Sequence, residues 1–257
     1  MLKVAINGLS GRVGQELLKV INSQAERYQL SDIQKSGTEA HVSESQFDLA
    51  AVSSQNTQVV VDFSSPEILD EVLDVCLKHN LPLVIGTTGF NSTQLQQIET
   101  AAQQIPILLS PNMSLSVNVL FKVCQMVAAK LTRAEVEITE SHHRYKKDAP
   151  SGTAIRLGEA IADARGHNFE QVACYNRYGN QNTTRVPEEI GFSVIRGGDI
   201  VGRHSVEFIY DGEILNLTSE ITNRGSFASG ALHAAEFLVK QVAGFYTMED
   251  VLGLRDI

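Results

Sequence analysis

The chain has 257 residues, enough for one large domain or two modest domains with a buried core. Hydrophobic residues make up 43% and charged residues 20%, values typical of globular proteins. The formal net charge of −9 argues against a general nucleic-acid-binding protein, because phosphate neutralisation requires a basic surface. No apolar run approaches membrane-spanning length, and a strand pattern begins at once, so we expect neither a membrane protein nor a signal peptide.

The first half of the chain alternates strand and helix patterns. A short buried strand pattern, Leu2–Asn7, breaks at Gly8, and helical apolar spacing begins after Gly11. Further strand patterns lie at 47–52, 59–63, 83–85 and 107–109, and helical patterns lie at 68–78 and 93–104. This alternation predicts a parallel sheet with helices on both faces.

The pattern changes after a long predicted helix at 116–130. Apolar and polar residues then alternate at 136–140, 192–195, 206–210 and 214–218, which is typical of antiparallel strands with one covered face. Asp211-Gly212 indicates a hairpin, and helices are expected at 152–164 and 227–242. We therefore predict an α/β chain: a Rossmann-like parallel-sheet domain, 1–114 and 223–257, plus a smaller α+β domain, 115–222, with a mainly antiparallel sheet.

The three cysteines carry little functional signal. Cys76, Cys124 and Cys174 are odd in number and lack CxxC spacing. This usage predicts reduced, structural thiols in a cytoplasmic protein, without a metal-binding framework.

The loop after the first strand has the sequence G-L-S-G-R-V-G, from Gly8 to Gly14. Glycines between a strand and a helix allow a tight turn and a close approach, while helix N–H groups and the helix dipole favour phosphate oxygens. Because GxxGxxG differs from the usual GxGxxG, a ligand-free turn is the alternative. The position after a strand and before a helix favours dinucleotide binding. Arg12 faces either the cofactor phosphates or solvent.

The residue that contacts the cofactor ribose is ambiguous. A carboxylate is expected about 20 residues after the glycine loop, and Asp32 is one candidate. Alternatively, Gln34-Lys35 ends the second strand, in which case Lys35 favours a 2′-phosphate. The sequence therefore leaves both NADPH and NADH open.

Two more segments follow predicted strands at the sheet edge where ligands bind in such folds. They are Gly86-Thr87-Thr88-Gly89 and Ser110-Pro111-Asn112-Met113. Such turns are often structural only. Their position nevertheless predicts cofactor contacts.

The run 140–154, E-S-H-H-R-Y-K-K-D-A-P-S-G-T-A, concentrates proton donors and cationic groups just before a helix start. His142 and His143 can each transfer a proton near neutral pH, and Lys146 can donate a proton or hold a carboxylate. Lys147 is expected in solvent. This combination suits a small dicarboxylate substrate. Without a third histidine or an acidic ligand set, no metal site is expected.

The alternative for this run is a solvated basic loop. However, Pro150 fixes one φ angle, Gly152 permits a close backbone approach, and Ser151 or Thr153 can cap a helix. These residues favour a specified turn.

Residues 140–154 closely resemble the E-x-H-H-x-x-K-x-D-A-P-S-G-T-A signature of the bacterial 4-hydroxy-tetrahydrodipicolinate reductase (dihydrodipicolinate reductase) family. The resemblance extends over essentially the whole chain, including the glycine loop and segments 61–64, 86–89, 196–204 and 227–231. The histidine–lysine signature is highly specific, whereas the glycine loops are not.

The resemblance implies NAD(P)H-dependent reduction of 4-hydroxy-tetrahydrodipicolinate in lysine and diaminopimelate biosynthesis. His142 and Lys146 match the catalytic proton-transfer groups, while His143 and the Gly152-Thr153 backbone match groups that bind substrate carboxylate. The residues that match cofactor contacts are Gly8, Leu9, Ser10, Gly11, Arg12, Val13, Gly86, Thr87, Thr88, Ser110, Pro111, Asn112 and Met113. The family pattern further implies a homotetramer assembled through domain 115–222, which also binds substrate.

The chain departs from the family pattern at Gln34-Lys35, where many members have Glu-Arg, at Met113, where Phe is commoner, and at 222–224. Two alternatives remain open. Another two-domain Rossmann reductase of a small dicarboxylate should lack the full histidine–lysine run, and a non-catalytic nucleotide-sensing regulator should lack the proton donors.

Overall fold

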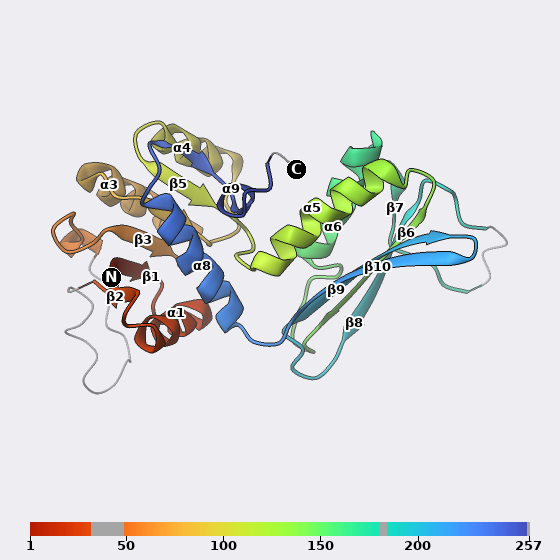
Figure 1. Cartoon of the computed structure of the whole chain (residues 1–257), viewed down its shortest axis with the longest axis horizontal. Coiled ribbons are helices and arrows are strands. Elements are labelled where there is room, and N and C mark those ends of the chain that lie inside the picture. Colours follow the sequence, from red (N-terminus) through yellow and green to blue (C-terminus); the bar gives the residue numbers. More distant parts are fainter. Residues whose placement is uncertain (32–48, 180–183, 256–257) are drawn as a thin grey trace. The chain divides into compact units, whose positions relative to one another are not determined.

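The computed structural model describes residues 1–31, 49–179 and 184–255, which form two compact units (Figure 1). Unit 1 comprises Met1–Leu115 and Arg224–Ile257, and unit 2 comprises Ser116–Asn223. These boundaries differ by a single residue from those expected from the sequence.

Among its described residues, unit 1 contains a six-stranded parallel sheet in the order β11-β5-β4-β3-β1-β2. Its strands are β1 (Leu2–Asn7), β2 (Tyr28–Leu30), β3 (Val59–Asp62), β4 (Leu83–Ile85), β5 (Pro106–Leu109) and β11 (Gly244–Tyr246). Its helices are α1 (Arg12–Ser23), α3 (Leu69–His79), α4 (Ser92–Ala102), α8 (Gly225–Leu238) and α9 (Met248–Val251), with the 3-10 turns η1 (Leu49–Ala51) and η2 (Pro66–Ile68).

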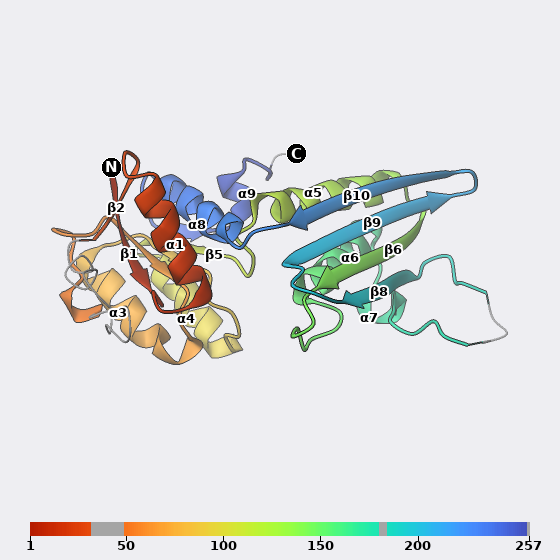
Figure 2. The same cartoon turned by 90° about the horizontal axis from the view of Figure 1, so that it is seen from below.

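Alternate residues of this sheet belong to two different cores. Val4 and Val61 pack with α1 and α8 on one face, and Ala5 and Val60 pack with α3 and α4 on the other (Figure 2). Both faces are therefore buried, which explains why these strands are nearly continuous apolar runs.

The C-terminal segment completes unit 1. Helix α8 contributes six buried residues to the first core, and β11 adds an edge strand beside β5. At Gly230 the helix lies so close to the chain after β5 that a Cβ would stand 1.8 Å from the Met113 carbonyl oxygen. Glycine at this position therefore sets the distance between α8 and that loop.

Unit 2 contains, among the residues described, a five-stranded sheet in the order β10-β9-β6-β8-β7. Its strands are β6 (Glu135–His142), β7 (Ala173–Cys174), β8 (Ile190–Arg196), β9 (Gly202–Tyr210) and β10 (Glu213–Ile221). Three helices accompany them: α5 (Leu115–Lys130), which begins at the last residue of unit 1, α6 (Gly152–Arg165) and α7 (Phe169–Val172).

The predicted fold class is confirmed, but the second sheet is mixed. Strands β10, β9 and β6 pair antiparallel, whereas β6–β8 and β8–β7 pair parallel. The connection from β6 to β8 runs through α6 and α7 and returns β8 in the direction of β6. Apolar and polar residues alternate in the same way in parallel and antiparallel strands, so the sequence pattern could not reveal that β8 runs parallel to β6.

One predicted strand is wrong. Within residues 47–52, the described part forms η1 (Leu49–Ala51) instead of a strand. Val52 still reaches the core beneath α3, whereas Ala51 is exposed, so only part of the described run is buried. A short apolar run does not by itself distinguish these outcomes.

Candidate functional site

The predicted nucleotide-binding segments follow strands that end at the same edge of the parallel sheet of unit 1. Residues 8–13 follow β1, residues 86–88 follow β4, and residues 110–113 follow β5. This carboxyl edge is where ligands bind in open α/β sheets. Lys35, together with Asp32 and Gln34, lies outside the described residues. Strand β2 ends at Leu30, before both of the candidates that the sequence leaves open, Asp32 and Gln34-Lys35.

The glycine loop has the geometry of a phosphate cradle. Gly8 has a φ of +84°, and a Cβ there would lie 2.4 Å from the Phe63 carbonyl oxygen. A Cβ at Gly14 would lie 2.2 Å from the Gly8 carbonyl oxygen. Gly11 precedes α1 without a capping side chain, and the first helical turn, which begins at the exposed Arg12, holds no acidic residue. The loop therefore fits an anionic pyrophosphate.

A buried carboxylate joins the ends of three strands beneath this loop. Asp62, at the end of β3, accepts hydrogen bonds from Asn7 Nδ2 (2.6 Å), Ser64 Oγ (2.6 Å) and Thr87 Oγ1 (2.5 Å). Burial raises the pKa of Asp62 despite these donors. The network fixes the start of the glycine loop relative to the turn after β4.

The loop after β5 folds on itself. Ser110 Oγ donates to the Asn112 carbonyl oxygen (2.8 Å), and the Ser114 N–H donates to Asn112 Oδ1 (2.9 Å). The Met113 side chain is 1% exposed and packs in the core with α8. Met113 is therefore a core residue at a position where Phe is commoner.

In unit 2 the histidine–lysine signature begins on a strand and ends on a helix. Strand β6 ends at His142, and α6 begins at Gly152 after the N-cap Ser151. Ser151 Oγ accepts from the Ala154 N–H (3.2 Å), and the first turn of α6 holds no acidic residue. Gly152 and Thr153 thus lie at a helix N-terminus, which favours a negative charge.

Glu140 is the central carboxylate of this region. It is 1% exposed and lies 2.5 Å through Oε2 from His142 Nδ1. Arg196 donates to both carboxylate oxygens at 2.8 Å, and the Ser151 N–H donates to Oε1 at 2.9 Å. Burial acts to raise the pKa of Glu140, but the hydrogen bonds from His142, Arg196 and Ser151 outweigh it and lower the pKa to about 2. Glu140 is therefore ionised at neutral pH.

A second buried imidazole lies against His142. The rings of His142 and His204 meet edge to face with centroids 5.1 Å apart. His204 Nε2 lies 3.1 Å from Ser151 Oγ, and burial, helped by the nearby His142, lowers the pKa of His204 to about 4. His204 is therefore neutral at pH 7.

The remaining signature residues are nearer to solvent. Lys146 Nζ lies 2.9 Å from Asp148 Oδ2, and the half-buried His143 lies beside the exposed Tyr145 ring, with centroids 6.2 Å apart. Lys147 is exposed, as expected. The structure thus brings His142 and the start of α6 together around Glu140, with His143 and Lys146 in the loop between them.

Comparison with known proteins assigns the whole chain. Dihydrodipicolinate reductase family models match residues 2–113 (N-terminus) and 116–252 (C-terminus). A 4-hydroxy-tetrahydrodipicolinate reductase of a Nitratiruptor species is 44% identical, covering 99% of this chain and 100% of the relative, and that of Nitrosomonas europaea is 42% identical, covering 99% of each. The chain belongs to the dihydrodipicolinate reductase family.

A solved structure agrees with this assignment. The dipicolinate-bound dihydrodipicolinate reductase of Paenisporosarcina sp. TG-14 is 25% identical, with a TM-score of 0.73 and coverage of 96% of this chain and 97% of that one. The present chain is an NAD(P)H-dependent reductase of 4-hydroxy-tetrahydrodipicolinate in lysine and diaminopimelate biosynthesis. Its N-terminal part is a nucleotide-binding Rossmann domain. The predicted family and activity are confirmed.

Sequence reasoning gave no role to several residues that organise the site of this reductase. Asp62, Glu140, Arg196 and His204 all lie in segments that carry the family resemblance. For Glu140 a signal existed in the sequence, because it lies two residues before His142, at the end of a predicted strand, and side chains at that spacing on a strand point to the same face. Other partners are distant in sequence, such as Arg196 for Glu140 and Asn7 for Asp62, so those hydrogen bonds could not be inferred.

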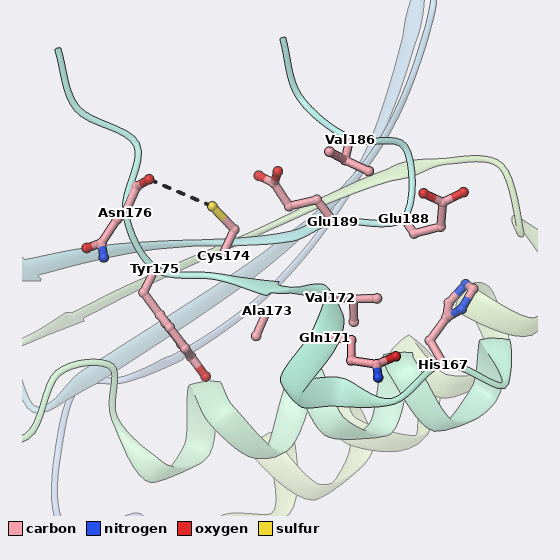
Figure 3. Close-up of a pocket in the computed structure, with 10 residues that line it drawn as sticks. All are labelled: His167, Gln171, Val172, Ala173, Cys174, Tyr175, Asn176, Val186, Glu188 and Glu189. Atoms are coloured by element: carbon pink, nitrogen blue, oxygen red, sulfur yellow. Dashed lines mark hydrogen bonds between the residues drawn. The ribbon is translucent and has the colours of Figure 1, made fainter. Parts of the chain in front are cut away.

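A cavity of about 580 Å³ lies elsewhere in unit 2, around β7 and the start of β8 (Figure 3). Its lining includes Cys174, Tyr175 and Glu189, and none of the predicted site residues of the reductase. Glu189 is already paired with Arg177. In the described parts of the chain, no cluster of metal-binding side chains and no helix of membrane-spanning length and apolarity is found.

Proposed function

We propose that unit 2 binds the dicarboxylate substrate at the N-terminus of α6 and transfers the proton of the reaction through His142 or Lys146. One observation supports this most directly. Glu140 accepts from the Ser151 N–H, just before α6, and is also bonded to His142 Nδ1. An anion-binding helix start and a proton-transferring imidazole are thereby adjacent, and the reduction of a small dicarboxylate needs both.

The substrate carboxylates are held by backbone and cationic groups. The N–H groups of Gly152 and Thr153 and the helix dipole of α6 attract one carboxylate, and His143 supplies a further contact. The dipicolinate bound to a 25%-identical relative is a ligand of the same dicarboxylate class. This anchoring fixes the ring of the substrate before reduction, which lowers the entropic part of the barrier.

The nicotinamide cofactor, when bound, supplies the hydride. The residues of unit 2 manage charge and the proton. Lys146 offsets negative charge that develops on the substrate during reduction. His142, bonded through Nδ1, has Nε2 available for proton exchange, and Lys146 is the other candidate donor.

In unit 1, residues 8–13, 86–88 and 110–113 hold the cofactor. The glycine loop and the start of α1 fit its pyrophosphate, and Lys35 is proposed to contact a 2′-phosphate. We expect the enzyme to use both NADPH and NADH, because one exposed charge pair is worth only about 0.2–1 kcal/mol.

We further propose that the enzyme is a cytoplasmic homotetramer assembled through unit 2. Apolar side chains are exposed on two strands of its sheet: Val194 and Ile195 on β8, and Ile214 and Leu215 on β10. Exposed apolar side chains of this kind are buried when they lie in an interface between protein chains.

A coupled assay tests the roles of His142 and Lys146. The substrate is generated in situ from pyruvate and aspartate semialdehyde by the upstream synthase, and NADPH oxidation is followed. His142→Gln and Lys146→Ala should each lower kcat by about 10²–10⁴-fold if both transfer protons. Lys147→Ala, one residue further along in solvent, should retain wild-type kcat. Near-normal turnover in both of the first two variants rejects the proposed roles.

A further inference from the structure

The carboxylate of Glu140 contacts both the imidazole proposed to transfer the proton and the N-cap residue of the helix proposed to bind the substrate. It bonds His142, two residues further along β6, and the Ser151 N–H before α6. It is 1% exposed.

The contact with Glu140 fixes which nitrogen of His142 carries hydrogen. An ionised carboxylate can only accept a hydrogen bond, so Nδ1 of His142 must be the donor. In the neutral imidazole, Nε2 is then the acceptor and the nitrogen left for chemistry. Gly202 lies against that nitrogen, and a Cβ at position 202 would stand 3.2 Å from it. The absence of a side chain there keeps space beside Nε2.

The carboxylate is itself held from β8 and the loop that follows. Arg196 donates hydrogen bonds to both carboxylate oxygens of Glu140 and to the Asp148 carbonyl oxygen, the last at 2.6 Å. The next residue, Gly197, donates its N–H to the His142 carbonyl oxygen at 3.0 Å. The end of β8 therefore fixes both the carboxylate of Glu140 and the main chain of His142.

We propose that Glu140 is a positioning residue of the reductase: it holds His142 with hydrogen on Nδ1 and presents Nε2 for proton transfer beside the substrate-binding start of α6. Arg196 keeps the carboxylate in place. This inference rests on the proposed roles of His142 and of the α6 N-terminus. Glu140 acts through His142, so its contribution to turnover exists only when the imidazole is present.

A double-mutant cycle on kcat tests that dependence. Glu140→Gln keeps the size of the side chain but removes the charge, and it should lower kcat by about 10–100-fold, a part of the general acid–base contribution. In a His142→Gln background the same change should alter kcat by less than about twofold, because the group it positions is gone. A merely structural role would lower kcat similarly in both backgrounds.

Glu137→Gln provides the matched control. Glu137 also lies on β6 and also pairs with an arginine, Arg177, but it does not contact the site. Wild-type kcat is expected. If His142→Gln lowers kcat and Glu140→Gln does not, the inference is wrong while the proposed function stands. If His142→Gln itself has normal kcat, the inference is also wrong, and Lys146 alone is left as the proton donor of the proposed function.

A spectroscopic measurement needs no variant at Glu140. In ¹⁵N-histidine-labelled wild-type enzyme, two-dimensional ¹H–¹⁵N spectra at alkaline pH report the tautomer of each neutral imidazole, and the His142 signals are assigned by their loss in His142→Gln. Hydrogen on Nδ1 is expected. Hydrogen on Nε2 overturns the proposal even if Glu140→Gln fails to fold.

Discussion

At the scale of single residues, the site is organised by buried polar groups that are hydrogen-bonded or packed against other protein groups. Asp62 joins the strand ends below the glycine loop, Glu140 orients His142, and His204 packs against that imidazole. Leaving such groups without partners costs about 1–3 kcal/mol each, so their hydrogen bonds restrict the site to one arrangement.

The substrate anchors should separate kinetically from the proton donors. His143→Ala and Thr153→Val are expected to raise KM with little change in kcat, because contacts made equally in the ground and transition states affect binding alone. Steady-state kinetics with the in situ substrate give both constants. A fall in kcat without a rise in KM would place these residues in the chemical step.

The pH dependence of stability should reveal the buried neutral His204. Its pKa is about 4 in the folded protein against an ordinary 6.5, so the unfolded chain binds an extra proton between these values. The free energy of unfolding therefore decreases as pH falls from about 6.5 to 4, by up to about 3 kcal/mol. Urea unfolding at pH 7 and 4.5 should show a smaller decrease in His204→Gln. Equal decreases in the two proteins would mean that folding does not lower the pKa of His204.

Cofactor preference can be tested at Asp32 and Lys35, the two candidates for the contact with the cofactor ribose. Lys35→Glu should shift kcat/KM from NADPH towards NADH, because a carboxylate repels a 2′-phosphate and accepts from a ribose hydroxyl. The preference of the wild type for NADPH should shrink as salt rises. If instead Asp32→Ala changes the ratio and Lys35→Glu does not, Asp32 contacts the ribose.

At the scale of elements, parallel strand ends and one returning helix build the sheet edge that we propose binds the cofactor. Strands β1, β3 and β4 are joined by the Asp62 network, and the loop after β5 is backed by α8. Close approach of that helix depends on Gly230. The geometry of the cofactor loops therefore depends on a segment more than 100 residues further along the chain.

Gly230→Ala tests this dependence. Alanine favours an isolated helix by about 1 kcal/mol over glycine. Here its Cβ would stand 1.8 Å from the Met113 carbonyl oxygen, so α8 or the loop must move. We expect a lower melting temperature and weaker NADPH binding. Ser229→Ala, at the exposed neighbouring position of the same helix, should leave both unchanged. A Gly230→Ala protein that is more stable than wild type would contradict this account of α8.

At the scale of the whole molecule, unit 1 is discontinuous in sequence. The face of its sheet that includes Val4, Val61 and Leu108 is covered in part by the C-terminal helix. A sheet with one face uncovered exposes apolar side chains that need another layer to bury them.

A chain truncated to residues 1–114 should therefore be unstable. It lacks α8 and β11, and we expect no cooperative thermal transition by circular dichroism and no NADPH binding comparable to the full chain. The full-length enzyme is the control. Cooperative unfolding together with full NADPH affinity in the truncated chain would show that the C-terminal return is dispensable for the nucleotide-binding unit.

The sequence by itself determined the family, the activity and most elements of the fold. The His142–Lys146 signature is dense and local, so neighbouring residues carry it without knowledge of their contacts. Hydrophobic periodicity likewise located α5 and α6 to within a residue or two. Local patterns suffice wherever the physical cause, such as one buried face or a helix cap, acts within a few residues.

Only the tertiary structure decided which side chains bond across the chain. Glu140 pairs with Arg196 and Asn7 with Asp62, at separations of 56 and 55 residues. These contacts follow from the alignment of strands β6 with β8 and of β1 with β3, which no local pattern encodes. The parallel pairing of β6 and β8 was missed for the same reason, because alternation marks a covered face and not the direction of the neighbouring strand.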